Sequence, residues 1–265
     1  MKIEKEIAVM NPKVFWKMVR NGDWRLPTIE PCEEYLKAGL CVIPKEYALD
    51  FLTFCHRNPR PCPIIDITDE GSPHPSISPE ADLRTDIPKY NVFVDGELKD
   101  EVTDINNLWR DDLIGFLLGC GVPLDRVLRE HGVDFISPHA LHISNIPCKP
   151  AGRFNGPMAV ACRLFKNMQD VVRAVQIASR MPFAHGTPVH IGDPTKIGID
   201  NIYKGAIVSV PEPIGMSTEN LIPVFWGCGC TLELVNKNAG LPLMITQAPA
   251  HMFITDRKAQ ELIGV

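Results

Sequence analysis

Two histidines, an arginine and an aspartate gather in one short segment, SRMPFAHGTPVHIGDPTKIGI at 179–199. Its prolines and glycines break a regular helix, and its polar residues disfavour a buried strand. Imidazoles exchange protons near neutral pH, and a carboxylate can orient an imidazole through its second nitrogen. The segment therefore predicts an acid–base site in which His185 and His190 act together with Asp193. The alternative is a proline-stiffened turn whose histidines are solvated.

A second segment, FWGCGCT, places two cysteines between glycines where a strand is expected to end. A helix beginning after the second cysteine would lower the pKa of a nearby thiol and offer backbone amides to an anion. Cys228 is therefore a candidate nucleophile. The backbone around Gly227, Gly229 and Cys230 is a candidate for stabilising an oxyanion. The alternative is a pair of buried cysteines in a tight turn.

Three further segments carry charges that could hold a substrate carboxylate. Arg84 and Asp86 lie on the loop ADLRTDIPKY, and arginine on an ordered loop is a natural bidentate partner for a carboxylate. Arg163 interrupts the apolar segment VACRLF, where a charge must be paired or must mark a site. His251 and Asp256 are an acid–base candidate and an orienting carboxylate in HMFITD. The alternatives are a solvated ion pair and a strand-end pair without a function.

Composition narrows the class of protein. The chain has 265 residues, 45% hydrophobic and 22% charged, and a net charge of −5 without a basic block, so we expect no nucleic-acid or anionic-membrane partner. Its apolar runs are too short to span a membrane, and the segment MKIEKEIAVMNP lacks the apolar core of a signal peptide. A cytoplasmic location is therefore expected. The nine scattered cysteines predict reduced thiols rather than a disulfide scaffold.

Hydrophobic periodicity predicts a mixed α/β, or α+β, protein. We expect helices at 11–21, 44–58 and 167–181, and two helices within 104–132 that meet around Gly119 to Pro123. We expect strands at 61–68, 140–147, 157–165 and 205–211, a hairpin at 90–102, a strand leading into a helix at 223–235, and one or two strands at 241–256. Residues 134–215 could form a smaller two-layer domain inserted into a larger α/β domain of residues 1–133 and 216–265.

Five segments, in this order, resemble the D-glutamate cyclase family of bacterial hydro-lyases. They are ALDFLTFCHRNPRPCPIID, DLRTDIPKYNVFVDG, HGTPVHIGDPTKIGI, PVFWGCGCT and ITQAPAHMFITD. The resemblance covers most of the chain, from about residue 20 to residue 256.

Several positions depart from the usual family pattern. GCGVPLD at 119–125 lacks two serines and shortens a glutamate to aspartate, and VACRL at 160–164 keeps only a valine and Arg163 of its block. Gln247 and Ala250 stand where a histidine and a glycine are usual. In FWGCGCT, a glycine and a cysteine replace alanine and valine. These differences indicate a divergent member whose substrate could differ.

The resemblance implies that D-glutamate is cyclised to 5-oxo-D-proline with loss of water, a reaction of amino acid metabolism that needs no cofactor. We expect Arg84 and Arg163 to fold the substrate by holding its two carboxylates. His185 and His190 would act as base and acid, with Asp193 fixing a tautomer.

Three alternatives stay open. Cys228 could carry the substrate as an acyl-enzyme. A metal-dependent hydratase of a small carboxylic acid would hold zinc or iron with His185, His190 and Cys228, although we expect no metal. The same arginines and amides could also serve a non-catalytic protein that binds a small anion. In each case the expected partner is a small carboxylate or amino acid, the site lies where the inserted segment meets the larger domain, and assembly into a homo-oligomer remains open.

Overall fold

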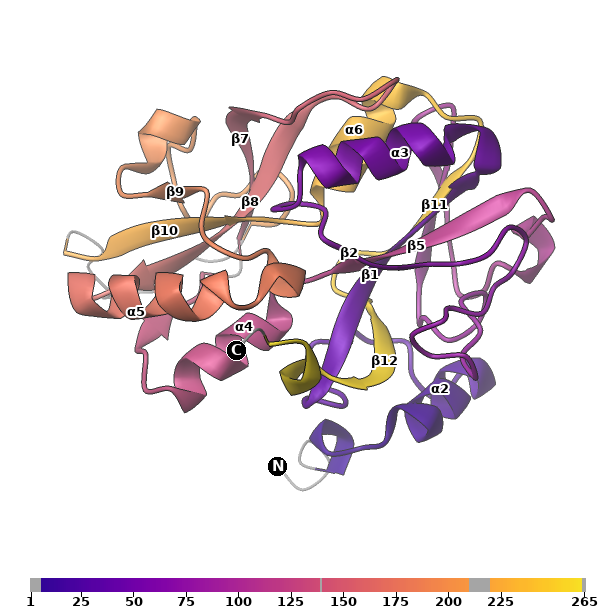
Figure 1. The fold of residues 1–265 in the computed structure, drawn as a ribbon, viewed down its shortest axis with the longest axis horizontal. Helices are drawn as coiled ribbons and strands as arrows, with labels where there is room; N and C mark the ends of the chain where they lie inside the picture. Colours follow the sequence, from indigo (N-terminus) through magenta and orange to yellow (C-terminus); the bar gives the residue numbers. More distant parts are fainter. Residues whose placement is uncertain (1–5, 139, 210–219, 264–265) are drawn as a thin grey trace.

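The computed structural model describes residues 6–138, 140–209 and 220–263, and its strands form two antiparallel sheets that lie side by side (Figure 1). The larger sheet, sheet A, has the strand order β2-β5-β1-β11-β3-β4, and β12 also pairs with β1. Its strands are β1 (Tyr35–Pro44), β2 (Ile64–Ile67), β3 (Tyr90–Val94), β4 (Glu97–Val102), β5 (Leu113–Gly119), β11 (Met244–Gln247) and β12 (Phe253–Lys258). Strand β1 is therefore central, with β5 on one side and both C-terminal strands on the other.

The smaller sheet, sheet B, has the order β6-β8-β10-β9, and β7 also pairs with β8. Its strands are β6 (Phe135–Ile136), β7 (Leu141–Pro147), β8 (Pro157–Phe165), β9 (His190–Ile191) and β10 (Ile222–Gly227). The β8–β10 pair runs in register from Phe165 opposite Ile222 to Val160 opposite Gly227. This pair fixes where the chain leaves sheet B, at the end of β10.

Helices connect the strands and cover the sheets (Figure 1). The α-helices that concern us are α2 (Pro12–Asn21), α3 (Lys45–Arg57), α4 (Val122–Glu130), α5 (Met168–Ser179) and α6 (Thr231–Ala239). Side-chain caps define two of their beginnings, because Asn11 accepts from the Lys13 amide and Asn167 accepts from the Asp170 amide. Short 3-10 helices include η2 (Pro182–Ala184) and η3 (Pro194–Ile197).

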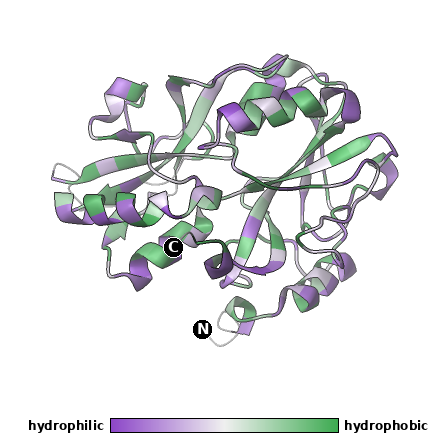
Figure 2. Cartoon of the chain, viewed as in Figure 1, coloured by the Kyte–Doolittle hydropathy of each residue, from purple (hydrophilic) through white to green (hydrophobic). Residues whose placement is uncertain are grey.

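One hydrophobic cluster joins the two sheets. It contains Cys41 and Phe116 of sheet A, Val160 and Phe225 of sheet B, and Phe51 of α3. Figure 2 shows hydrophobic residues along the strands, and both hydrophobic and hydrophilic residues on the helices. Because both sheets contribute to one buried cluster, the position of one sheet depends on the other.

The α+β class predicted from periodicity is confirmed, with helices at 11–21, 44–58 and 167–181 and a hairpin at 90–102 close to their predicted bounds. The first of the two helices predicted within 104–132 is wrong, because residues 113–119 form β5. This strand lies between β1 and β2 and is apolar almost throughout, and so short an apolar run has no periodicity that separates strand from helix.

The strand predicted at 205–211 is also wrong over the residues that the structure describes. Val208 makes only an isolated bridge to Leu141, and residues 210 and 211 lie outside the described residues. We predicted that the segment after residue 216 would complete the first sheet. Strands β11 and β12 do join sheet A, whereas β10 pairs with β8 in sheet B. The division into two domains stays a prediction. None of the described helices has the length and hydrophobicity needed to cross a membrane.

Candidate functional site

The candidate site lies where β5 and β10 end and each turns into a helix. Strand β5 passes through Cys120 into α4, and β10 passes through Cys228 into α6. The glycine before each cysteine is packed against another backbone. A Cβ at Gly119 would lie 1.6 Å from the Phe183 carbonyl oxygen, and a Cβ at Gly227 would lie 2.8 Å from the Pro61 nitrogen. These contacts bring two distant segments of the chain against the two turns.

His185 is buried beside these turns, with 4% of its surface exposed and a φ of 72°. Its Nδ1 lies 2.7 Å from the Arg60 carbonyl oxygen. A carbonyl can only accept, so Nδ1 carries the proton and Nε2 keeps a free lone pair in the neutral ring. Burial lowers the pKa of His185 to about 4, which keeps the ring neutral at physiological pH.

Arg163 approaches the same point from β8 and is 6% exposed. Its Nε donates to the Asp125 carboxylate of α4 at 2.6 Å, and Nη2 donates to the Gly121 carbonyl at 3.3 Å. A Cβ at Gly121 would lie 3.4 Å from both Arg163 Nη2 and His185 Cδ2. The guanidinium and the imidazole therefore converge on Gly121, at the start of α4.

Cys228 precedes the first turn of α6. The Cys230 thiol and then the Cys230 backbone amide lower the pKa of the Cys228 thiol against the effect of burial, and the Arg163 charge acts in the same direction. The pKa of the Cys230 thiol is raised well above its usual range, because it faces the Cys228 sulfur and is buried. Cys228 is thus the more acidic thiol of the pair. Only Cys120, Cys228 and Cys230 are partly exposed, whereas the other six cysteines are buried.

The sequence analysis did not identify Lys37, on β1. Its side chain is almost fully buried, at 1% exposure, and Nζ donates to the Ile29 carbonyl oxygen. Burial lowers the pKa of Lys37 to about 8, while the nearby Cys120 sulfur opposes this change. Lys37 interrupts the apolar strand YLKAGLCVIP, just as Arg163 interrupts VACRLF. The same criterion would therefore have identified Lys37 from the sequence.

Two further polar residues near α6 were also missed. Glu233 lies in the first turn of α6, where burial raises the pKa of its carboxyl group and the Asn91 side chain partly opposes this. Asn91 Oδ1 is buried and has no hydrogen-bond partner in the described part of the chain. A buried acceptor without a partner is costly and is a common feature of sites that bind polar ligands.

The predicted partners of His185 lie elsewhere. His190 belongs to β9, and its Nε2 lies 2.8 Å from the backbone carbonyl of Asp193. The Asp193 carboxylate accepts from the Thr195 amide at 3.0 Å and from the Thr195 hydroxyl at 2.7 Å. Asp193 therefore caps the short helix η3, and its described hydrogen bonds go to Thr195 and not to an imidazole, although the nearby His190 helps to lower the pKa of its carboxyl group. The odd spacing of the two histidines separates their environments, as alternation along an extended chain would.

Arg84 and Asp86 are occupied by other partners. Arg84 Nη2 lies 2.7 Å from the Asp82 carboxylate, and Asp86 is buried and accepts from Arg20 Nη2 at 2.6 Å. Both pairs hold the loop between β2 and β3 in place. The geometry therefore favours a structural role for these two residues.

His251 and Asp256 also have separate partners. His251 Nδ1 lies 2.7 Å from the Pro249 carbonyl oxygen, and Asp256 accepts from the Ser78 hydroxyl at 2.7 Å. The described hydrogen bonds of His251 and Asp256 do not join the two side chains. Their predicted role as an acid with its orienting carboxylate is not supported by this arrangement.

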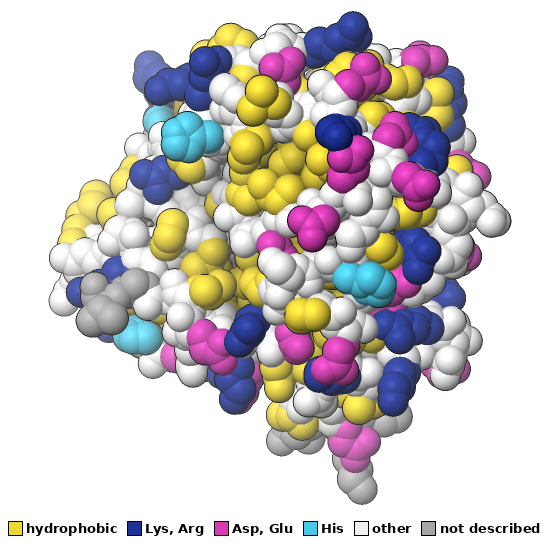
Figure 3. Space-filling view, turned by 45° about the vertical axis from the view of Figure 1, so that its right-hand side comes forward, with side chains coloured by type: hydrophobic (Ala, Val, Ile, Leu, Met, Phe, Trp, Pro, Cys, Tyr) yellow, Lys and Arg dark blue, Asp and Glu magenta, His cyan; other side chains and the backbone are white. Residues whose placement is uncertain are grey.

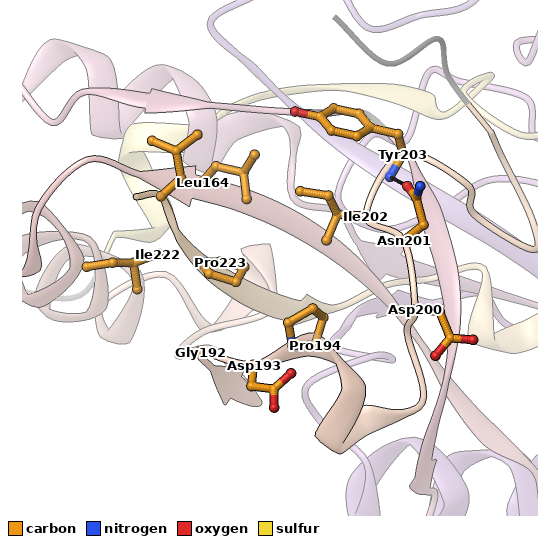
Figure 4. A pocket seen from close by; sticks show the side chains of 11 residues that line it. Leu164, Gly192, Asp193, Pro194, Asp200, Asn201, Ile202, Tyr203, Ile222 and Pro223 are labelled. Atoms are coloured by element: carbon orange, nitrogen blue, oxygen red, sulfur yellow. Dashed lines mark hydrogen bonds between the residues drawn. The ribbon is translucent and has the colours of Figure 1, made fainter. Parts of the chain in front are cut away.

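A cavity of about 580 Å³ lies beside the first residues of β10 and the end of β8 (Figure 4). Asp193, Asp200 and Asn201 line it together with apolar side chains such as Leu164 and Ile222. It contains none of the buried cations, thiols or imidazoles described above. We therefore place the candidate site at the strand-to-helix turns, where buried ionisable groups converge.

Among the described residues, no group of three or more His, Cys, Asp or Glu side chains is arranged to hold a metal ion. His185, His190 and Cys228, the set that a metal-dependent hydratase would use, therefore do not form such a group. On the face drawn in Figure 3, acidic and basic side chains are interspersed around hydrophobic ones, without a large patch of one sign.

Comparison with known proteins gives a consistent result. The family model described as D-glutamate cyclase matches residues 114–256. A relative from Geobacillus kaustophilus is 46% identical over 96% of this chain and 97% of its own length. A Bacillus licheniformis relative is 44% identical over 95% and 97%, and one from Bacillus subtilis is 41% identical over 96% and 99%. All three bear the name "putative hydro-lyase". A nitrogen repressor-like protein from Methanococcus jannaschii aligns over 94% of this chain and 99% of its own, but with 11% identity and a TM-score of 0.37.

Proposed function

The chain belongs to the D-glutamate cyclase family, and from this premise we propose that it cyclises D-glutamate to 5-oxo-D-proline with loss of water. The proposed site is the junction of the two strand-to-helix turns. The observation that supports it most directly is the convergence of neutral His185 and charged Arg163 on Gly121. A base and a fixed cation side by side suit a substrate that carries both an ammonium group and carboxylates.

His185 is the proposed base. Ring closure requires the substrate nitrogen to lose two protons in all, form a bond to the side-chain carboxyl carbon and expel one oxygen as water. The free Nε2 can take the two protons in turn and give each to the departing oxygen, which leaves as water. A pKa of about 4 makes His185 a weak base in the free protein, but a bound dicarboxylate would raise this pKa through its negative charge.

The two buried cations are the proposed carboxylate ligands. Arg163 keeps its guanidinium plane fixed by Asp125 and by the Trp226 ring, whose centroid lies 4.8 Å from the guanidinium carbon. Lys37 is the second cation, in place of Arg84. The first turn of α6 would stabilise the tetrahedral oxyanion, since no atom lies within 4 Å of a Cβ placed at Gly229 and the turn is open there.

A covalent route is the second candidate, and the lowered pKa of the Cys228 thiol favours it. The thiolate would add to the side-chain carboxyl carbon and water would leave, giving a thioester. The amine would then displace the thiolate and close the ring. Both routes use the same site and release one water.

Proton NMR of the purified protein with D-glutamate tests the proposal. We expect 5-oxo-D-proline to form, and His185→Asn to lower kcat by about 100-fold or more, the usual effect of losing a general base. His190→Asn is the matched control and should keep its activity, because His190 lies in β9 with other partners. Cys228→Ser separates the two routes, since only the covalent route requires the thiol. Absence of conversion by the unaltered protein would contradict the proposal.

A further inference from the structure

The two strand-to-helix turns repeat one another in sequence and in structure. Gly119-Cys120-Gly121 begins at the last residue of β5 and leads into α4, and Gly227-Cys228-Gly229 begins at the last residue of β10 and leads into α6. The two strands belong to different sheets, and each is paired antiparallel with a long strand, β1 or β8. In both turns the first glycine packs against a foreign backbone, which fixes the position of the cysteine that follows. Each sheet therefore presents one thiol at a helix N-terminus.

The surroundings of the two thiols also match. The sulfur of Cys120 receives the amide of Val122, and the sulfur of Cys228 receives the amide of Cys230, in each case two residues further on. Each thiol interacts with a buried cation, Lys37 for Cys120 and Arg163 for Cys228. The two sulfurs are also near enough for the charge of Cys228 to act on Cys120. Two carboxylates complete the surroundings, Asp125 beside Cys120 and Glu233 beside Cys228.

Despite this similarity, the pKa values of the two thiols are shifted in opposite directions. Burial raises the pKa of Cys120 to about 11, against the opposing effects of the Val122 amide and Lys37. The pKa of Cys228 is lowered, chiefly by the Cys230 thiol. Two similar groups whose surroundings separate their pKa values are typical of an acid and a base that act together. Two observations besides the thiols suit a polar ligand here: Lys37 is buried, and Asn91 Oδ1 has no hydrogen-bond partner in the described part of the chain.

We propose that Cys120 and Cys228 act from opposite sides on the α-carbon of an amino-acid carboxylate, exchanging its α-proton and inverting its configuration. The Cα–H bond breaks as the Cys228 thiolate takes the proton. The Cys120 thiol then gives its own proton to the opposite face of Cα. Nothing is oxidised or reduced, and the pair is left with its protonation reversed, ready for the opposite enantiomer or for proton exchange with water. Lys37 and the helix N-termini stabilise the charge that moves onto the substrate carboxylate.

This activity goes beyond cyclisation, because no C–O bond breaks. The expected ligands are glutamate and 5-oxoproline in either configuration, since both carry an α-proton beside a carboxylate. A protein with both activities would accept L-glutamate as a source of the D-enantiomer.

Incubation of the protein in D₂O tests the inference. D- and L-glutamate and D- and L-5-oxoproline are supplied separately, loss of the α-proton is followed by proton NMR, and configuration is read by chiral chromatography. We expect deuterium at Cα and formation of the opposite enantiomer from at least one pair. Cys120→Ser and Cys228→Ser should each lower inversion by about 100-fold or more. Cys148→Ala, a buried thiol of the hydrophobic cluster, is the matched control and should leave inversion unchanged.

Retention of the α-proton in all four compounds by the unaltered protein would overturn the inference, whether or not the variants fold. Inversion that survives in both folded serine variants would also overturn it. The same samples report formation of 5-oxoproline from D-glutamate, so the two proposals fail separately. Cyclisation with the α-proton retained would contradict only the proposed inversion by the two thiols. Exchange of the α-proton without cyclisation would contradict only the proposed cyclisation.

Discussion

At the scale of single residues, buried charge identifies the site, and Lys37 is the clearest case. A buried ammonium without a carboxylate partner destabilises the folded state, and here burial lowers the pKa to about 8. We expect Lys37→Met to raise the free energy of unfolding at pH 7 by about 1–3 kcal/mol, while kcat/KM for the substrate falls at least about 10-fold. Urea unfolding and the NMR assay measure the two effects.

Lys45→Met is the control for this substitution, because Lys45 is exposed on α3 and paired only with Glu70. It should change stability by less than about 0.5 kcal/mol. A Lys37→Met protein that is less stable and fully active would show that Lys37 serves the fold instead of the site.

His185 predicts a specific dependence of stability on pH. Its pKa is about 4 in the folded protein and about 6.5 in the unfolded chain, so between these values only the unfolded chain binds the proton. Stability from this residue is therefore complete above pH 6.5 and is lost as the pH falls towards 4, by at most about 3 kcal/mol. His185→Asn, which tolerates the positive φ, should show a flatter profile in urea titrations from pH 7 to pH 4. Parallel profiles for the two proteins would contradict this assignment.

At the scale of secondary-structure elements, the sequence predicts the features that local signals define, and it mispredicts the buried strand β5. Caps at Asn11 and Asn167 and the Asp95-Gly96 turn of the hairpin are determined by neighbours in sequence, and the sequence predicts them. β5 was mistaken for a helix because its burial on both faces removes the alternation that reveals a strand. The joint role predicted for His185 and His190 stays a prediction; the structure places His190 in β9, paired with β10, and His185 beside the Arg60 carbonyl.

The turn between β5 and α4 gives a prediction at this scale. A Cβ at Gly119 would overlap the Phe183 carbonyl oxygen, whereas a Cβ at Gly229 would meet no atom within 4 Å. We expect Gly119→Ala to lower the free energy of unfolding by about 3 kcal/mol, because relief requires the backbone to move, and Gly229→Ala to change it by less than about 1 kcal/mol. Thermal unfolding of the two variants compares them directly. Equal stabilities would mean that the segment around Phe183 is not held against the turn.

At the scale of the whole molecule, the site is assembled from segments that are distant in sequence. Lys37 lies in sheet A and Arg163 in sheet B, whereas Cys120, Cys228 and His185 lie in connecting segments. Strand order and register bring these segments together. A single sequence identifies Arg163 and Cys228 as unusual, because each conflicts with its local pattern. A single sequence does not determine which strands are neighbours. It therefore cannot show that Arg84 is paired with Asp82, or that the described contact of Lys37 Nζ is with a backbone carbonyl and not with a carboxylate.

The shared hydrophobic cluster predicts that the two sheets unfold together. Phe116 of β5 packs in the same cluster as Val160 of β8 and Phe225 of β10, so exposure of either sheet exposes the other. Pulsed amide hydrogen exchange along a urea series, read on peptides from β5 and β8, should give midpoints within about 0.3 M of each other. Activity should disappear at the same urea concentration, because segments attached to both sheets form the site. Exchange of β8 at a clearly lower urea concentration than β5 would instead establish two domains that unfold independently, and activity would then be lost with sheet B while sheet A is still folded.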